Sequence, residues 1–328
     1  ADDQSGSIRL NAAEGNIIIG DGKSTSSSIG EGDGIATNTN NINVSLNGKY
    51  NYVSAGKNAV HSMGSGDITI KAVRPDAEEG GISTLADYVD YTNVLVGGEN
   101  GILTEADGNT KVIADADNFI AGATNGILSN GTSMITVEAG NNNYIGQYTD
   151  ENNQTATSQT AINASSGTVS VTAGKENIIT ATANGVVSDG DGTSVSLSGA
   201  SNTITVHNTT GAQVVGVDAT ENGSVDITSN NGDFNVGLET TGVRAYGISA
   251  GRTSNGGGTV DVTTTNGDIG INITTGAPSA TKGNVYGVWA KNSGTVTLTS
   301  GKNIVISTNS SIGERPTNTG LDVVGIRA

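Results

Sequence analysis

The hydrophobic positions of this chain repeat as three short pulses, and the first of them recurs ten times. This first pulse is a small residue followed by Ile or Val, the second is an alternating run such as Val169-Ser170-Val171, and the third follows an Asn or Asp. Alternation with a period of two predicts strands, and three short strands per repeat without a helix predict a β-solenoid. The ten copies of the first pulse are Gly34-Ile35, Ala59-Val60, Gly101-Ile102, Gly126-Ile127, Ala161-Ile162, Gly185-Val186, Gly216-Val217, Gly247-Ile248, Gly287-Val288 and Gly325-Ile326.

The repeats differ in length, and the extra residues fall mainly at one corner. Successive copies of the first pulse are 24 to 42 residues apart, whereas the second pulse leads to the Asn or Asp of the third in seven or eight residues. The added length therefore lies between the third pulse and the next first pulse, and we expect these loops to stack along one edge of the solenoid. The segments concerned are 20–33, 146–160, 207–214, 238–245, 273–285 and 307–323.

One segment departs from this pattern. Residues 73–92 expand a different corner, and Ser83 to Tyr91 have the spacing of a short amphipathic helix. We expect this insertion to project from the solenoid, either as a binding element that presents Tyr88 and Tyr91 or as a lid over an exposed side.

The composition supports a solenoid and argues against several other classes. With 49 Gly, no Cys and 3% aromatic residues, the chain has little bulk for an ordinary globular core, whereas each coil of a solenoid buries only a few Ile, Val and Leu. A net charge of −17 disfavours a nucleic-acid partner. No stretch reaches the roughly 20 apolar residues of a membrane span, so we expect no direct membrane insertion by this segment.

The side-chain pattern also predicts what faces inwards. Tyr246 and Tyr286 precede the inward Ile248 and Val288 by two residues, so alternation predicts that they are core residues, and we expect the same of Phe119, Tyr144 and Phe234. The Asn residues that open the third pulse are expected to form hydrogen-bonded ladders between coils. These are Asn118, Asn143, Asn177, Asn202 and Asn303.

Two runs carry a family resemblance. Gly167-Thr-Val-Ser-Val-Thr-Ala-Gly174-Lys-Glu-Asn-Ile-Ile179 is repeated in outline by Gly294-Thr-Val-Thr-Leu-Thr-Ser-Gly301-Lys-Asn-Ile-Val305. Such repeats resemble the passenger domain of a monomeric (type V) bacterial autotransporter adhesin, which implies a right-handed parallel β-helix. We expect one all-β domain over 1–328, with about ten coils of three strands and loop insertions on one edge. Because the last first-pulse copy lies at the very end, we expect the natural chain to continue beyond residue 328.

The resemblance implies a function as well as a fold. It implies export through the outer membrane to the bacterial cell surface or extracellular space, as a secreted virulence protein. The expected role is non-catalytic adhesion to glycans or proteins of host or neighbouring cells, or self-association in autoaggregation and biofilm. The alternatives are a polysaccharide-degrading β-helix enzyme, lyase or glycoside hydrolase, and a passive stalk whose binding tip lies elsewhere.

The candidate ligand-binding residues are aromatic and cationic. Trp289 and Arg327 occupy equivalent outward positions of neighbouring coils, where a sugar ring or a cation–π contact could be accommodated; the alternative is that Trp289 packs under the loop 307–323. Tyr148, in the insertion 146–160, joins Tyr88 and Tyr91 as a candidate on a loop.

Catalytic and metal chemistry have weaker support. Asp226 and Asp261 should be neighbours on consecutive coils, as a glycosidase pair would require, yet no cation or His accompanies them. We therefore expect no enzyme activity. The acidic, glycine-rich turns 30–34 and 189–192 could bind calcium weakly, but they match no calcium-loop spacing, and no cofactor or tight metal site is expected.

Overall fold

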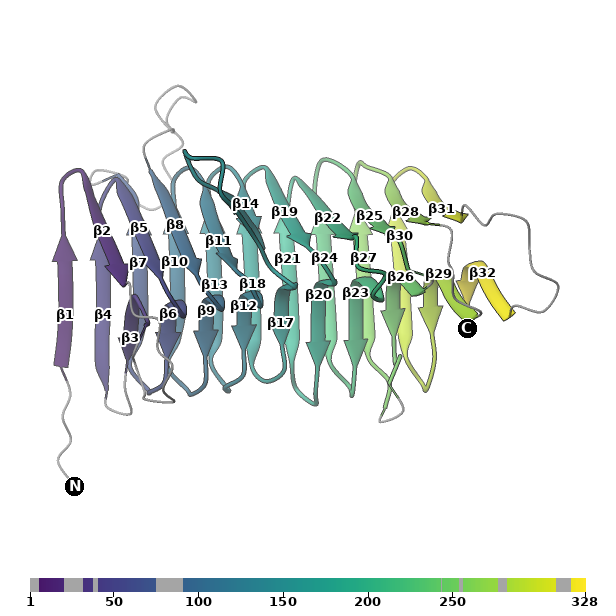
Figure 1. Ribbon diagram of the computed structural model, residues 1–328, viewed down its shortest axis with the longest axis horizontal. Coiled ribbons are helices and arrows are strands. Elements are labelled where there is room, and N and C mark those ends of the chain that lie inside the picture. The colour runs from purple at the N-terminus through teal and green to yellow at the C-terminus, as the bar shows by residue number, and fades with distance from the viewer. Residues whose placement is uncertain are drawn as a thin grey trace. The chain divides into compact units, whose positions relative to one another are not determined.

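The computed structural model describes residues 6–20, 32–37, 41–74, 91–242, 244–253, 256–276, 282–310 and 320–328. In these ranges the chain consists of strands and turns, and the strands form three parallel sheets to which each repeat contributes one strand in turn (Figure 1). The predicted parallel β-solenoid is confirmed, while the right-handed sense of its coil stays a prediction.

Sheet A contains the alternating second-pulse strands, and the inward Val, Ile and Leu of its strands between the two end strands are mostly buried. Its strands are β1 (Gly6–Asn11), β4 (Ile42–Asn47), β7 (Ile68–Ala72), β10 (Thr110–Ala114), β13 (Met134–Ala139), β18 (Thr168–Ala173), β21 (Ser194–Gly199), β24 (Ser224–Ser229), β27 (Thr259–Thr264) and β30 (Thr295–Ser300).

Sheet B contains the third-pulse strands. They are β2 (Gly15–Gly20), β5 (Tyr50–Ala55), β8 (Thr92–Gly97), β11 (Asn118–Gly122), β14 (Asn143–Ile145), β19 (Glu176–Ala181), β22 (Ser201–Asn208), β25 (Phe234–Thr240), β28 (Ile269–Thr275) and β31 (Ile304–Ser310).

Sheet C contains all ten copies of the first pulse. Its strands are β3 (Ile35–Thr37), β6 (Asn58–Ser62), β9 (Asn100–Thr104), β12 (Asn125–Ser129), β17 (Thr160–Ala164), β20 (Asn184–Asp189), β23 (Val214–Thr220), β26 (Arg244–Ala250), β29 (Lys282–Ala290) and β32 (Gly320–Arg327). A separate antiparallel hairpin is formed by β15 (Gln147–Thr149) and β16 (Thr155–Thr157).

The chain divides into two compact units. The first consists of Ala1–Ser158 with Gly167–Glu176, and the second of Gln159–Ser166 with Asn177–Ala328. Within each unit, consecutive strands of a sheet pair in parallel, as β4 pairs with β7 in the first unit and β24 with β27 in the second. One domain over 1–328 stays a prediction. The hairpin in 146–160 falls between sheet B and sheet C, as the repeat lengths predicted.

A ladder of buried Asn runs through the first unit at the start of the sheet B strands. The amide nitrogen of Asn51 donates to the side-chain oxygen of Asn93 at 2.8 Å, Asn93 to Asn118 at 2.9 Å, and Asn118 to Asn143 at 2.9 Å. Each nitrogen also donates to a carbonyl of sheet A; Asn93, for example, donates to Ile113 at 2.8 Å. These bonds satisfy amides that would otherwise be costly to bury.

The second unit has a shorter ladder. Asn177 donates to Asn202 at 2.7 Å, which confirms the prediction for these two residues. Asn303 also bonds to the neighbouring coil as predicted, because its amide donates to the carboxylate of Asp268 at 2.9 Å, but it does so at an exposed corner and not in the buried ladder. The seven-residue spacing placed Asn303 at the corner just before β31, one residue short of the inward position.

Candidate ligand-binding surfaces

The small residue of the first pulse decides which side chains of sheet C face outwards. The pairing between β23 and β26 joins Val215 to Tyr246 and Val217 to Ile248 but passes over the glycines between them. Such a break puts residues three apart on one face, as in β6, where the Asn58 amide nitrogen lies 3.5 Å from Nδ1 of His61. The glycine itself faces inwards: a Cβ on Gly247 would lie 2.5 Å from Cγ2 of Ile271.

This inversion corrects the inward facing that was predicted for Tyr246 and Tyr286, whereas their predicted burial is confirmed. Both are buried, but they pack with the outward Trp289, whose ring centroid lies 5.2 Å from that of Tyr246 and 5.1 Å from that of Tyr286. Strict alternation assigned them to the interior because it ignored the break at Gly247 and Gly287. We call this group the Trp289 cluster; it comprises Val215, Tyr246, Tyr286, Trp289 and Val324.

Arg327 lies beside Trp289 in the pairing of β29 with β32, as the sequence predicted. Its guanidinium, however, donates to the hydroxyl of Tyr286 at 2.6 Å and lies 5.3 Å from the centre of that ring, while Lys291 lies 5.6 Å from the centre of the Trp289 ring. Trp289 is half-buried by its aromatic neighbours. The loop expected to cover it includes residues 311–319, which lie outside the described residues. A ligand-binding role for Trp289 and Arg327 stays a prediction.

Tyr148 belongs to a second aromatic group, on the outer side of sheet B in the first unit. In register, Tyr52 pairs with Val94, Val94 with Phe119, and Phe119 with Tyr144. The rings of Phe119 and Tyr144 stack with centroids 4.6 Å apart, and Tyr148 from the β15–β16 hairpin meets Phe119 edge-on at 5.9 Å. The prediction that Phe119 and Tyr144 are core residues was therefore wrong. The same prediction for Phe234 is confirmed, because its side chain is fully buried. We call this surface the aromatic face; it comprises Tyr50, Tyr52, Phe119, Tyr144 and Tyr148.

The phenols of Tyr50, Tyr144 and Tyr148 are protonated at neutral pH. Burial, together with neighbouring Tyr148, Tyr52 and Glu151, raises the pKa of Tyr50 to about 12. Burial also raises the pKa of Tyr144, with Asp117 adding to the effect, and that of Tyr148, with Tyr52 and Asp150 adding. These side chains offer both an apolar ring and a hydroxyl donor to a ligand.

The two remaining candidates belong to the insertion 73–92. Tyr91 is half-buried, and the guanidinium of Arg74 lies 6.0 Å from the centre of its ring. Tyr88 lies outside the described residues, as does the expected helix from Ser83 to Tyr91 apart from Tyr91. The structure thus shows a contact within the chain for Tyr91 and leaves its binding role a prediction.

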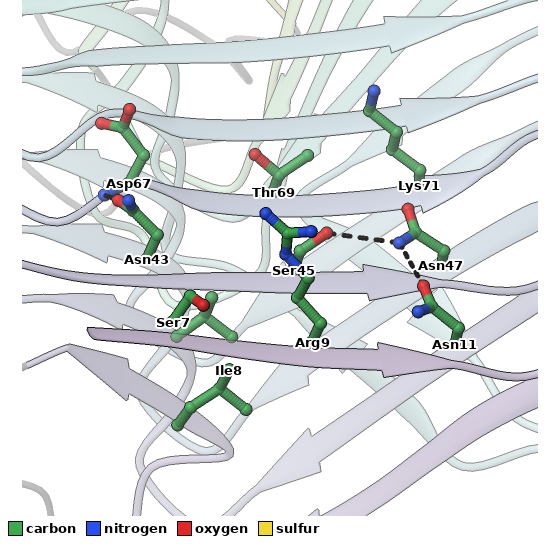
Figure 2. A pocket seen from close by; sticks show the side chains of 11 residues that line it. Ser7, Ile8, Arg9, Asn11, Asn43, Ser45, Asn47, Asp67, Thr69 and Lys71 are labelled. Carbon is green, nitrogen blue, oxygen red and sulfur yellow. Dashed lines mark hydrogen bonds between the residues drawn. The ribbon is translucent and has the colours of Figure 1, made fainter.

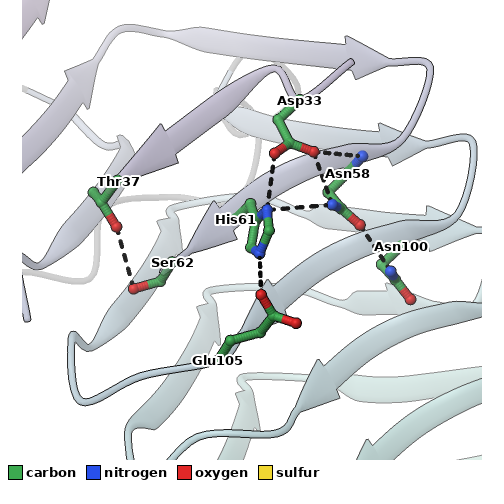
Figure 3. A network of polar contacts seen from close by, with 7 residues as sticks. All are labelled: Asp33, Thr37, Asn58, His61, Ser62, Asn100 and Glu105. Atoms are coloured by element: carbon green, nitrogen blue, oxygen red, sulfur yellow. Dashed lines mark hydrogen bonds and ion pairs between the residues drawn. The ribbon is translucent and has the colours of Figure 1, made fainter. Parts of the chain in front are cut away.

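A polar network on sheet C was not predicted from the sequence. Nδ1 of His61 lies 2.8 Å from the carboxylate of Asp33, and its Nε2 lies 2.8 Å from that of Glu105 (Figure 3). Asp33 also accepts from the amide of Asn58 at 2.8 Å. Both ring nitrogens face carboxylates, so the arrangement suits an imidazolium ion.

The pKa shifts in this network follow from the same contacts. Burial by itself would lower the pKa of His61, but hydrogen bonds and attraction from Asp33 and Glu105 outweigh it, and the net shift is upwards. Burial would raise the pKa of Asp33, yet His61 and the Asn58 hydrogen bonds lower it. Because both imidazole nitrogens are occupied, the ring has no free nitrogen with which to act as a base or metal ligand.

The candidate catalytic pair is also present. Asp226 and Asp261 pair in register between β24 and β27, as predicted, and burial together with the charge of Asp261 raises the pKa of Asp226. The same row continues to Ser196 on one side and Thr297 on the other. No cation or His therefore stands at the positions next to the pair.

Clusters of metal ligands and membrane-spanning helices are both absent from the described ranges. There, no three His, Cys, Asp or Glu side chains lie together as a metal ion would require. Among the same residues there is no helical segment with the length and hydrophobicity of a membrane span. Comparisons of the chain with models of protein families, with curated proteins and with solved structures gave no match.

Proposed function

We propose that this chain is a non-catalytic adhesin of a bacterial cell surface, which holds its ligand on the outer side of the solenoid. The observation that carries the proposal is the aromatic face. It gathers four of the eight Tyr and one of the two Phe on the solvent side of sheet B and on the β15–β16 hairpin that contacts it. Half-exposed Tyr and Phe with little rotamer freedom are typical contact residues of binding surfaces.

The shape of the surface supports binding without catalysis. A parallel sheet holds each side chain at a fixed spacing of about 4.8 Å from its neighbour on the next strand, so the face needs little ordering when a partner arrives. The nearby acidic residues Asp117, Asp150 and Glu151 give it hydrogen-bond acceptors. A flat, repetitive array of this kind fits an extended glycan or protein surface held through several weak contacts.

Export across the outer membrane and display on the cell surface are part of the proposal. They rest on the resemblance of the repeats to autotransporter passengers and on the absence of Cys from the sequence. Self-association in aggregation or biofilm is the nearest variant of the same function, because two such faces could meet each other.

The first test measures binding of the purified chain to a glycan panel, mucin, matrix proteins and the chain itself. We expect saturable binding to at least one of these, and at least a tenfold loss of affinity in the double variant Tyr144→Ala/Tyr148→Ala. Thr205→Ala, on the exposed side of sheet B in the second unit, is the matched control and should bind as the unaltered chain does. Absence of binding to every partner would overturn the proposal.

A polysaccharide-degrading enzyme is the second candidate, favoured by the pairing of Asp226 with Asp261 and by the raised pKa of Asp226. A retaining glycosidase requires two close carboxyl groups, one of them protonated. Incubation with polysaccharides followed by size analysis of the products tests this directly. Cleavage that disappears in both Asp226→Asn and Asp261→Asn would establish the enzyme and displace the adhesin.

A further inference from the structure

A polar groove lies on the outer side of sheet A in the first unit, across strands β1, β4 and β7, with a volume of about 480 Å³ (Figure 2). Its floor is a grid set by strand register: Arg9 pairs with Ser45 and Ser45 with Thr69, while Asn47 of the next row pairs with Lys71. With strands about 4.8 Å apart and same-face residues about 6.8 Å apart, three rows on three strands cover roughly 10 by 14 Å. This area accommodates a short oligosaccharide.

The groove contains two cations, Arg9 and Lys71, that no carboxylate of the described residues neutralises. Within the described ranges, neither Arg9 nor Lys71 forms an ion pair, although Lys49, Arg74 and Lys111 each lie within 3.6 Å of a carboxylate. Two unpaired cations on one open face are notable in a chain of net charge −17. They provide a local attraction for an anion, and a guanidinium is well suited to a carboxylate.

The groove is chemically polarised. At the end opposite Lys71 lies Asp67, whose carboxylate already accepts from the backbone and side-chain nitrogens of Asn109 at 2.9 and 3.3 Å. An anionic group would be repelled there, but a hydroxyl could donate to the carboxylate. A fitting ligand therefore has its anion towards Arg9 and Lys71 and hydroxyl groups towards Asp67.

The remaining lining residues are hydroxyls and amides rather than aromatics. The Asn47 amide nitrogen donates to the side-chain oxygen of Asn11 at 2.7 Å and contacts Ser45 at 3.3 Å, which fixes the two amides in place. The side-chain oxygen of Asn47 and the amide nitrogen of Asn11 face the groove without a hydrogen bond to any described residue. Such preorganised donors and acceptors suit the hydroxyl groups of a sugar.

We propose that the polar groove binds an acidic oligosaccharide, with a sugar carboxylate held by Arg9 and Lys71 and sugar hydroxyls held by the Asn and Ser side chains and by Asp67. This site is separate from the aromatic face. It adds a charge-selective contact to the proposed adhesion and names the class of glycan that the first unit would select.

The test is calorimetric titration of the whole chain with trigalacturonate, with its methyl ester as the neutral analogue and with inorganic sulfate. We expect saturable binding of trigalacturonate that weakens at least tenfold in Arg9→Gln/Lys71→Gln. The methyl ester should bind at least tenfold more weakly than the acid, and sulfate should not compete. Raised salt should weaken the binding, because the cations are exposed.

The control removes the same two charges elsewhere in the first unit, in Lys57→Gln/Lys175→Gln. We expect this variant to bind within twofold of the unaltered chain, and circular dichroism should show unchanged folding in both. An equal loss of trigalacturonate affinity in the two double variants would mean that only long-range attraction is at work, and it would overturn the proposal. The proposal would also be overturned if the acid and the ester bound equally well, if sulfate displaced trigalacturonate, or if trigalacturonate did not bind.

Adhesion through the aromatic face and oligosaccharide binding in the polar groove can be tested independently of each other. Tyr144→Ala/Tyr148→Ala should leave trigalacturonate binding within twofold, because the aromatic face lies on sheet B and the groove on sheet A. A tenfold loss in that variant would contradict a separate groove. Failure of the trigalacturonate titration alone would leave adhesion through the aromatic face standing.

Discussion

The position that opens the sheet B strands is occupied by Asn in the first unit, whereas in the second unit it changes from Asn to apolar residues. In the first unit, the inward position that opens a sheet B strand is Asn in successive coils, hydrogen-bonded along the stack. In the second unit, Asn202 pairs in register with Phe234, and the position then continues as Ile269 and Ile304. The same backbone therefore accepts either an amide ladder or an apolar stack.

The junction between the two solutions shows what an amide ladder requires. Asn202 has no amide above it, and its nitrogen donates instead to Oγ of Ser229 at 2.9 Å and to the carbonyl of Thr228 at 2.8 Å. A hydroxyl thus ends the ladder where Phe234 begins the apolar stack. A buried Asn is stable when each neighbour completes its hydrogen bonds, whereas Phe or Ile needs only a matching volume.

The largest effect is expected from breaking the Asn ladder. Asn93→Leu removes two donated bonds and one accepted bond, and leaves the oxygen of Asn118 without its donor. We expect a loss of about 3 kcal/mol in the free energy of unfolding, against about 1 kcal/mol for Phe234→Leu in the apolar stack. Urea unfolding followed by circular dichroism measures both. Equal losses would contradict the distinction between the two units.

An intermediate effect is expected at the small residue of the first pulse. A Cβ at Gly247 would lie 2.4 Å from the carbonyl oxygen of Gly287 and 2.5 Å from Cγ2 of Ile271, whereas one at Gly237 meets no atom within 4 Å. We expect Gly247→Val to cost about 2 kcal/mol through overpacking and Gly237→Val to cost much less. Thermal unfolding of the two variants provides the measurement, and similar melting temperatures would argue against an inward Gly247.

The smallest effect is the pH dependence that His61 and Asp33 give to the stability of the first unit. Because the pKa of His61 is raised, its contribution to stability is complete below the unfolded value of about 6.5 and is lost as the pH rises through the folded value. The pKa of Asp33 is lowered, so its contribution is present above 3.8 and is lost as the pH falls through the folded value.

The stability difference between the unaltered chain and His61→Gln should accordingly be larger at pH 5.5 than at pH 9. Unfolding in urea at both pH values measures it. His207→Gln is the control, since that ring is exposed and has a single carboxylate contact, with Glu239. A difference that grows with pH would contradict an imidazolium between Asp33 and Glu105.

Much of the fold could be predicted because it depends on local spacing. Alternation and the recurring small residue predicted the strands of all three sheets, and register then placed Trp289 beside Arg327 and Asp226 beside Asp261. Both neighbour relations follow from stacking coils whose strands are equivalent, and the spacing of the repeated pulses already indicates that equivalence.

For several side chains the sequence could not predict whether they lie on the inner or the outer side of the sheet, because this depends on how two strands pair. The break at Gly247 reverses the expected side of Tyr246. The contact of His61 with Asp33 and Glu105 joins residues 28 and 44 positions apart through turns that follow no repeat. The polar groove likewise required the register of three strands.

The most direct test of the proposed function is oxidative footprinting of the chain with and without a ligand identified in the binding panel. Protection is expected at Tyr50, Tyr52, Phe119, Tyr144 and Tyr148, with Tyr246 and Tyr286 of the Trp289 cluster unchanged. Protection confined to the Trp289 cluster, or none at saturating ligand, would contradict binding through the aromatic face.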